Sequence, residues 1–333
     1  EDGSLIFEKP LNYYKDHYKG EMIGVRSQNA DLLVTPNHNL FTSRRYSRKK
    51  VWLEPEHVHA EDIYGRDGLH RFHTTCSDWE GYTFKKYNSV DFFEFLGFWF
   101  AEGYAGKYDR TDTIGHHYRL VVTQNDSNGY VEDLLDRNGF KYGKCAKKGS
   151  DCFNYTISNA TREIKELTEL LCEYGKATDK WIPHWIKNAQ KEYLLAFLKG
   201  YMKGDGSYKT GPKNCDHLYT ASKQLADDLQ EIVFKTGRYA VINYQVRKEG
   251  TELFTLTLMT PSREHPDIRK QHWRKVSYDG MVYCLEVPTH VVYVRRNGKC
   301  CWSGQTFPEL RDTTQRTVFD WFDWGKHRVQ ANE

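Results

Sequence analysis

Two stretches of this 333-residue chain end an apolar segment with a carboxylate followed by a glycine. Residues 95–103 carry Glu102, and residues 198–206 carry Asp205. Both stretches favour a helix with two small residues four positions apart, a spacing that lets two helix backbones approach closely. A carboxylate at the C-terminal end of a helix meets an unfavourable dipole, so a divalent cation is its natural counter-charge.

Packed as a pair, the two helices would bring Glu102 and Asp205 together, although 103 positions separate them. Paired carboxylates that hold a divalent metal ion are suited to phosphodiester hydrolysis. Two ordinary core helices with glycine caps are the alternative interpretation. The second matching copy favours a functional repeat.

These segments resemble the paired motifs of LAGLIDADG homing endonucleases, the second closely and the first more loosely, with Glu102 where the family usually has Asp. The segment Lys180-Trp181-Ile182-Pro183 precedes Asp205 by 25 positions and resembles the family's Lys-x-Ile-Pro, whose lysine enters the cleavage site. The resemblance covers about residues 90–260.

The resemblance implies a saddle of two sheets that binds a long double-stranded DNA site. It implies Mg²⁺ at Glu102 and Asp205, where water would be activated to attack one phosphate on each strand, and Lys180 would stabilise the developing charge. Pseudo-symmetry leads us to expect a second lysine in the site, either Lys275 or Lys270.

The composition, 39% hydrophobic and 15% aromatic, gives a chain of this length room for two or three folded units. No apolar run reaches the length of a membrane span and no signal peptide opens the chain, so we expect a soluble, cytoplasmic monomer (in a phage or prokaryotic host) with no membrane partner.

The net charge of +3 is mild, so a nucleic-acid surface must come from local clusters. Eight cysteines without a Cys-x-x-Cys pair argue for free thiols rather than zinc.

Around the two motifs the pattern helix–strand–strand–helix recurs with a period near one hundred residues. Asn88 or Ser89 is the expected N-cap of the first motif helix. Further helices are expected over residues 128–138, 160–174 and 222–236, each ending at a glycine, and strands over residues 21–25, 31–34, 118–123, 153–157, 218–220, 240–246, 254–259, 282–287, 291–295 and 299–302.

A basic run lies among the N-terminal β segments and comprises Arg44, Arg45, Arg48, Lys49 and Lys50. A solvated loop is one interpretation of such a run. The other is a contact with the DNA backbone, because clustered Lys and Arg gain from counterion release.

The outer β segments resemble the splicing domain of an intein in which an endonuclease is lodged. Thr35-Pro36-Asn37-His38 matches the Thr-x-x-His motif, whose threonine and histidine polarise the N-terminal scissile peptide. Residues 282–287 and the following His290 match the motif near the C-terminal splice site, with Cys284 at a position that holds Asp or Cys in the family. Taken singly, these are an ordinary turn and a small residue in a strand.

The junction Gln305–Thr306 is consistent with such an intein, because the residue after the splice site must supply a nucleophilic side chain. The segment after it, residues 306–312, weakly resembles a phage terminase large subunit. Gly304 departs from the family, which usually has a histidine there, so we expect slow cyclisation of Gln305 that a histidine at position 304 would speed. No N-terminal Cys or Ser nucleophile is present, so we expect the first strands to be missing and a partner N-terminal intein and extein portion to be required.

The expected fold class is α+β: an all-β splicing domain interrupted by a pseudo-symmetric, two-repeat αββαββα endonuclease. The expected boundaries are residues 1–88 and 276–305 for the splicing domain, 89–275 for the endonuclease (repeats 89–187 and 188–275), and 306–333 for the tail. Two alternatives stay open, a DNA-binding module that has lost cleavage and an autoprocessing domain with a relic endonuclease. Glu102 in place of Asp favours the first alternative, and intact Asp205 and Lys180 speak against it.

Overall fold

The computed structural model describes residues 3–305 apart from 47, 48, 50, 67–69, 84, 85, 87, 110–114, 126, 127, 211–213 and 249. The chain divides into two compact units. Unit 1 consists of residues 1–5 and 75–264, and unit 2 of residues 6–74 and 265–333. Unit 1 therefore interrupts the sequence of unit 2. Its bounds differ from the expected 89–275, because residues 75–88 join unit 1 and residues 265–275 join unit 2.

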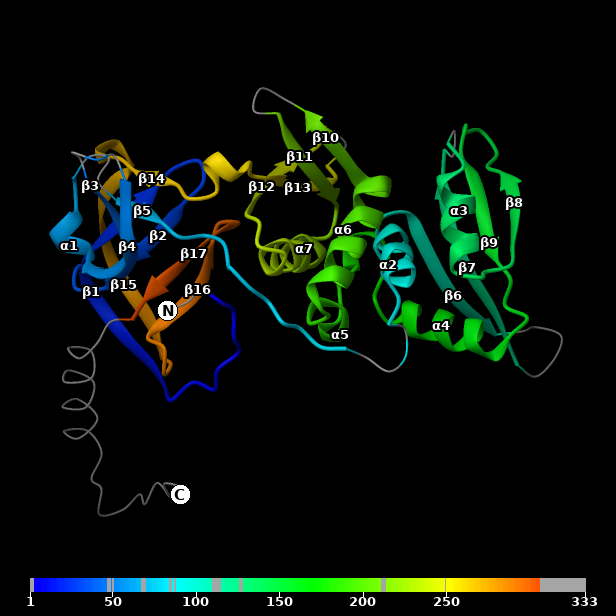
Figure 1. Ribbon diagram of the computed structural model, residues 1–333, viewed down its shortest axis with the longest axis horizontal. Helices are drawn as coiled ribbons and strands as arrows, with labels where there is room; N and C mark the ends of the chain where they lie inside the picture. Colours follow the sequence, from blue (N-terminus) through cyan, green and yellow to red (C-terminus); the bar gives the residue numbers. More distant parts are fainter. Residues whose placement is uncertain are drawn as a thin grey trace, which may run out of the picture. The chain divides into compact units, whose positions relative to one another are not determined.

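Unit 1 is built on two helices, α2 (Val90–Glu102) and α6 (Lys191–Asp205), which lie side by side in Figure 1. As expected, Ser89 caps α2 by accepting a hydrogen bond from the Phe92 N–H at 3.0 Å. The side chains of α2 from Phe92 to Phe100 are buried, because this helix packs against neighbours on most of its sides.

The two helices touch backbone to backbone at one glycine of each. A Cβ on Gly97 would lie 2.9 Å from the Tyr201 nitrogen, and a Cβ on Gly200 would lie 2.9 Å from the Phe98 nitrogen. These contacts are related by the offset of 103 residues that relates Glu102 to Asp205. The helix pair therefore has the two-fold pseudo-symmetry that the repeat predicts.

Each motif helix runs directly into a four-stranded antiparallel sheet, and the two sheets share one strand order, first–second–fourth–third. The first repeat contains β6 (Gly103–Asp109), β7 (His116–Gln124), α3 (Tyr130–Arg137), β8 (Tyr142–Ala146), β9 (Phe153–Ile157) and α4 (Arg162–Cys172). After η1 (Ala177–Asp179) and α5 (His184–Lys187), α6 begins the second repeat with β10 (Gly206–Thr210), β11 (Cys215–Thr220), α7 (Lys223–Lys235), β12 (Ala240–Val246) and β13 (Glu252–Leu258). A short η2 (Pro261–Arg263) ends this unit.

The helices of unit 1 begin and end at residues that favour these positions. Thr161 and Ser222 cap α4 and α7 through their hydroxyl oxygens. Gly139, Gly175 and Gly237, which follow α3, α4 and α7, all adopt a positive φ, which glycine accepts without strain. These helices bury their apolar faces in one continuous core with the sheets.

Unit 2 is β-rich, and its main ribbon joins the two ends of its interrupted sequence. The strand β1 (Asn12–Arg26) pairs with β15 (Trp273–Glu286) from Asn12 opposite Glu286 to Val25 opposite Trp273. Its other elements are β2 (Asp31–Val34), β3 (Asn39–Tyr46), β4 (Val51–His59), α1 (Ala60–Ile63), β5 (His70–Phe72), β14 (Asp267–Ile268), η3 (Lys270–His272), β16 (Val291–Arg296) and β17 (Lys299–Gly304).

The eight cysteines are free thiols, as expected. None of the described helices is long and apolar enough to span a membrane.

Candidate active site

Glu102 and Asp205 are the last residues of α2 and α6, and a strand begins at the next residue of each. Gly103 and Gly206 make this change of direction in extended backbone conformations. A Cβ on Gly206 would lie 2.5 Å from the carbonyl oxygen of Met202, so the tight helix exit excludes a side chain there. The exits thus hold both carboxylates at the same end of the helix pair.

Electrostatics at this end disfavour two ionised carboxylates. Burial, and then the charge of Asp205, raise the pKa of Glu102 to about 7, although Lys180 and Lys147 act in the opposite direction. Burial also raises the pKa of Asp205 to about 6. A bound cation would favour the ionised forms of both partly buried acids and so offset these rises in pKa.

Lys180 reaches the end of α2 from the segment that follows η1. Its Nζ donates to the carbonyl oxygens of Phe100 and Gly103, both at 2.9 Å, and of Trp99 at 3.2 Å. These are carbonyls that a helix end leaves unsatisfied. Burial lowers the pKa of Lys180 to about 8, although both carboxylates act to raise it. The structure therefore brings Lys180 together with Glu102 and Asp205.

The second repeat holds the segment that carries Lys180. Ser222, the N-cap of α7, donates from its hydroxyl to the carbonyl oxygen of Lys180 at 2.6 Å. The buried carboxylate of Asp228 accepts from the backbone N–H of Ile182 and from Nζ of Lys187, each at 2.8 Å. One helix of repeat two thus positions the lysine that faces the end of the repeat-one helix.

Gln124 is a site residue that the sequence analysis missed. Its Nε2 donates to Glu102 Oε1 at 3.3 Å and to the carbonyl oxygen of Lys203 at 3.4 Å. Only an alignment of the two repeats would have located it. In the first sheet, Gln124 lies two residues after the residue that pairs with Gly103. In the second sheet, Thr220 lies two residues after the residue that pairs with Gly206. An amide and a hydroxyl thus occupy equivalent register positions in the two sheets.

Lys275 and Lys270 are the two candidates that the sequence offers for a second site lysine. Both lie in unit 2, and Lys275 Nζ pairs with a carboxylate oxygen of Glu21 at 2.5 Å. Lys147, in the loop after β8 of unit 1, is the other lysine whose charge acts on Glu102. Its side chain is exposed.

The donor set fits a hard divalent cation. The two helix-end side chains offer carboxylate oxygens only, and no cluster of three or more His, Cys, Asp or Glu that could hold a metal occurs in the described part of the chain. Mg²⁺ is commonly held by one or two carboxylates plus water and substrate phosphates. A site built by Glu102 and Asp205 would therefore be completed by the substrate.

We expect metal binding to strengthen as the pH rises from about 5.5 to 8. The folded-state pKa values of Glu102 and Asp205 are raised to about 7 and about 6, so the folded protein holds these protons more tightly than the unfolded chain does. The two groups therefore add to the free energy of unfolding of the metal-free protein at low pH, and this contribution is lost as the pH rises through these values. A cation binds the ionised forms and so recovers the lost stability. Thermal unfolding with and without Mg²⁺ should show a larger stabilisation at pH 8 than at pH about 5.5, and the affinity for Mg²⁺ should be at least ~10-fold higher at pH 8. Equal stabilisation at both pH values would contradict this.

Unit 2 gathers a second cluster around the end of β17. His38 Nε2 and Ser303 Oγ are 2.9 Å apart. The backbone N–H of His38 donates to the carbonyl oxygen of Thr35 at 3.0 Å, which closes the turn over residues 35–38. His290 Nδ1 donates to Gln305 Oε1 at 3.4 Å. Burial, with help from nearby histidines, lowers the pKa of His38 to about 4, so its imidazole is neutral at pH 7.

The remaining sequence-predicted residues lie apart from these contacts or outside the described residues. Cys284 lies in β15 opposite Tyr14 and is not part of the contacts above. Thr306 and the rest of the tail lie outside the described residues.

The basic run belongs to unit 2, at the connection of the β3–β4 hairpin. Three of its side chains are exposed, those of Arg44, Arg45 and Lys49. The Arg45 guanidinium lies 6.0 Å from the centre of the Trp52 ring. Arg48 and Lys50 lie outside the described residues. A DNA contact and a solvated turn both fit this position.

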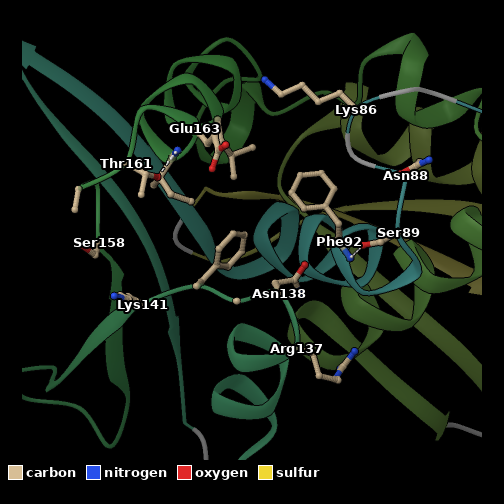
Figure 2. A pocket seen from close by; sticks show the side chains of 15 residues that line it. Lys86, Asn88, Ser89, Phe92, Arg137, Asn138, Lys141, Ser158, Thr161 and Glu163 are labelled. Carbon is tan, nitrogen blue, oxygen red and sulfur yellow. Dashed lines mark hydrogen bonds between the residues drawn. The ribbon is translucent and has the colours of Figure 1, made fainter.

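A surface cleft of about 650 Å³ lies in the first repeat, away from the carboxylates. Figure 2 shows Lys86, Arg137 and Lys141 around it, beside the capping residues of α2 and α4. Two of its cations are already paired, Lys86 with Glu166 at 3.2 Å and Arg137 with Asp133 at 2.9 Å. The cleft is not lined by Glu102, Asp205 or Lys180.

Residues 192–264, which contain Asp205 and most of the second repeat, match the family model described as LAGLIDADG-like domain. Solved structures similar to this chain include I-DmoI in complex with DNA and Mn (16% identity, TM-score 0.38, 51% of this chain and 89% of that chain). The N-terminal LAGLIDADG domain of DUF199/WhiA is also similar (13% identity, TM-score 0.33, 54% and 80%).

Curated relatives match most of the chain. They include a DNA-directed RNA polymerase subunit beta C-terminal section of Stigeoclonium helveticum (25% identical, 92% of this chain, 33% of the relative). An ATP-dependent Clp protease proteolytic subunit of Chlamydomonas moewusii (21%, 94%, 32%) and a DNA polymerase of Methanocaldococcus jannaschii (25%, 74%, 15%) also match. The chain thus spans about a third or less of the length of these relatives.

Proposed function

We propose that unit 1 is a site-specific, metal-dependent DNA endonuclease of the LAGLIDADG homing type. The observation that carries this proposal is the convergence of Glu102 and Asp205 at the ends of two glycine-packed helices, beside the buried Lys180. The family match over residues 192–264 supports it. The substrate is a long double-stranded DNA site, read by strand residues in the major groove and held through its phosphates.

Each site residue has a role set by its contacts. A bound divalent cation, with Mg²⁺ as our choice, would supply charge neutralisation at the scissile phosphate and acidify water. Lys180 is held by three carbonyl oxygens with its charge directed at the helix ends, where it offsets negative charge that develops on a phosphate. Gln124 orients the longer Glu102 side chain through its Nε2 donor.

The test of this activity is cleavage of a plasmid library that carries randomised duplex inserts. We expect Mg²⁺-dependent double-strand breaks whose captured ends share one sequence, and no breaks with a chelator. Binding that enriches one sequence without breaks would favour the non-cleaving DNA-binding module instead. Neither binding nor breaks would favour the relic endonuclease.

We further propose that unit 2 is the splicing domain of an intein, with Thr35, His38, Cys284, His290, Gln305 and Thr306 as its reacting and assisting residues, and a phage terminase large subunit as host. Two observations support it. Unit 1 interrupts a β unit whose two ends pair along β1 and β15. The relatives named above have unrelated activities, and a shared intervening segment explains why one sequence matches all of them.

Splicing predicts a defined junction. Expressed with an N-terminal splicing segment that carries a Cys or Ser nucleophile, this chain should join its tail, beginning at Thr306, to the partner's flanking sequence. Thr306→Ala should abolish ligation, because no hydroxyl remains to form the branched ester. Gln305→Ala should let the branch form and accumulate. Mass spectrometry of the products decides, and a ligated product from Thr306→Ala would refute the junction.

A further inference from the structure

The carbonyl group of Gln305 is held at the edge of the histidine cluster in unit 2. Asn39 Nδ2 donates to the Gln305 carbonyl oxygen at 2.9 Å, and His290 holds the side-chain oxygen. Gln305 is 3% exposed, and its Nε2 is buried without a hydrogen-bond partner among the described residues. A buried, unpaired amide is costly, so its retention indicates a chemical use.

Gly304 leaves room for an imidazole from a different strand. A Cβ on Gly304 would lie 2.6 Å from His57 Nδ1 and 2.6 Å from the Asn39 carbonyl oxygen. His57 belongs to β4, where it lies opposite Phe41 of β3. The ring of His57 thus occupies the space beside the Gly304–Gln305 peptide that a side chain at position 304 would otherwise fill.

We propose that Asn39 and His57 complete the C-terminal cleavage centre at Gln305: Asn39 as the hydrogen-bond donor to the attacked carbonyl, and His57 as the imidazole that position 304 lacks. This inference rests on the proposed splicing function and names residues that the intein motifs do not include.

The step balances without an outside reactant. Gln305 Nε2 gives up a proton to the imidazole and forms a bond to the Gln305 carbonyl carbon. The carbonyl oxygen becomes an oxyanion that accepts the Asn39 hydrogen bond. The bond to the nitrogen of residue 306 then breaks, and that nitrogen takes the proton, which leaves a cyclic imide at position 305. Burial and the charge of His290 lower the pKa of His57, which keeps its ring neutral and able to accept a proton.

The structure also reverses the expectation for position 304. A histidine there would collide with the backbone oxygen of Asn39 and with the ring of His57. We therefore expect Gly304→His to slow release of the tail rather than to speed it.

The experiment follows release of the tail from the full chain, expressed with the N-terminal splicing segment, by mass spectrometry. Release should leave residues 1–305 one water lighter than the free acid. We expect His57→Ala to slow release ~100-fold and added imidazole to restore much of the rate. Asn39→Ala should cost ~100-fold, and the isosteric Asn39→Asp at least as much, because the donor is lost. His17→Gln, at an exposed position of β1 in the same unit, serves as the matched control and should release at the normal rate.

The outcomes separate the two levels of the proposal. If the wild-type chain releases no tail, or releases it at another bond, the splicing function itself is wrong. If the wild type releases at Gln305 and the His57→Ala and Asn39→Asp proteins keep pace with it, the present inference is overturned. A slow His57→Ala protein that imidazole does not restore would show a structural role only, and would also overturn it.

Discussion

Asp205→Asn is expected to abolish DNA cleavage while leaving DNA binding intact. Asp205 ends α6 with a carboxylate that burial makes hard to ionise without a cation, and the amide of asparagine cannot provide that negative ligand. Metal ions supply several kcal/mol of transition-state stabilisation, so we expect a rate at least ~1000-fold lower. The measurement pairs single-turnover cleavage of the selected site with a binding titration on the same duplex.

A matched control comes from the other end of the same helix. Glu192 is an exposed acid in the first turn of α6, so Glu192→Gln removes one negative charge from the helix without touching the site. This variant should cleave at the normal rate. Normal cleavage by Asp205→Asn, or equal losses in both variants, would show that Asp205 does not hold the reacting metal.

Gly200→Ala is expected to unfold unit 1 at a markedly lower temperature and to abolish cleavage with it. The added methyl group would lie 2.9 Å from the backbone nitrogen of Phe98, and backbone cannot give way as a side chain can. Overpacking of this kind costs ~3 kcal/mol at its upper end, which corresponds to a fall in Tm of roughly 6–12 °C for a unit of this size. Calorimetry of the full chain measures the fall directly.

Gly143→Ala controls for the substitution itself. Gly143 lies in β8 of the same unit with nothing within 4 Å of an added Cβ, and its φ is not positive. It should unfold close to the wild-type temperature. A Gly200→Ala protein as stable as this control would mean that the helices are not packed backbone to backbone.

The sequence alone determined most of the local structure. The N-cap Ser89 and the glycines after α3, α4 and α7 lie where the sequence placed them, because capping depends on residues close together along the chain. The strands expected over residues 291–295 and 299–302 are likewise present as β16 and β17, joined at Asn297-Gly298 with both residues at positive φ. The pairing of Glu102 with Asp205 was also predictable, because an internal repeat implies a symmetric contact.

Longer-range contacts were decided only by the tertiary structure. No local signal marks Gln124, which reaches Glu102 through sheet register, or Ser222, which holds Lys180 from a helix 42 residues further on. The surroundings of Lys275, expected from pseudo-symmetry as a candidate second site lysine, also depend on tertiary structure: it lies in β15 of unit 2, where it pairs with Glu21 of β1. Asn39 meets Gln305, and His57 lies beside Gly304, only because β3 and β4 pass beside the end of β17. Sequence periodicity reports which face of an element is buried, but neighbours across strands and between repeats depend on how the elements pack.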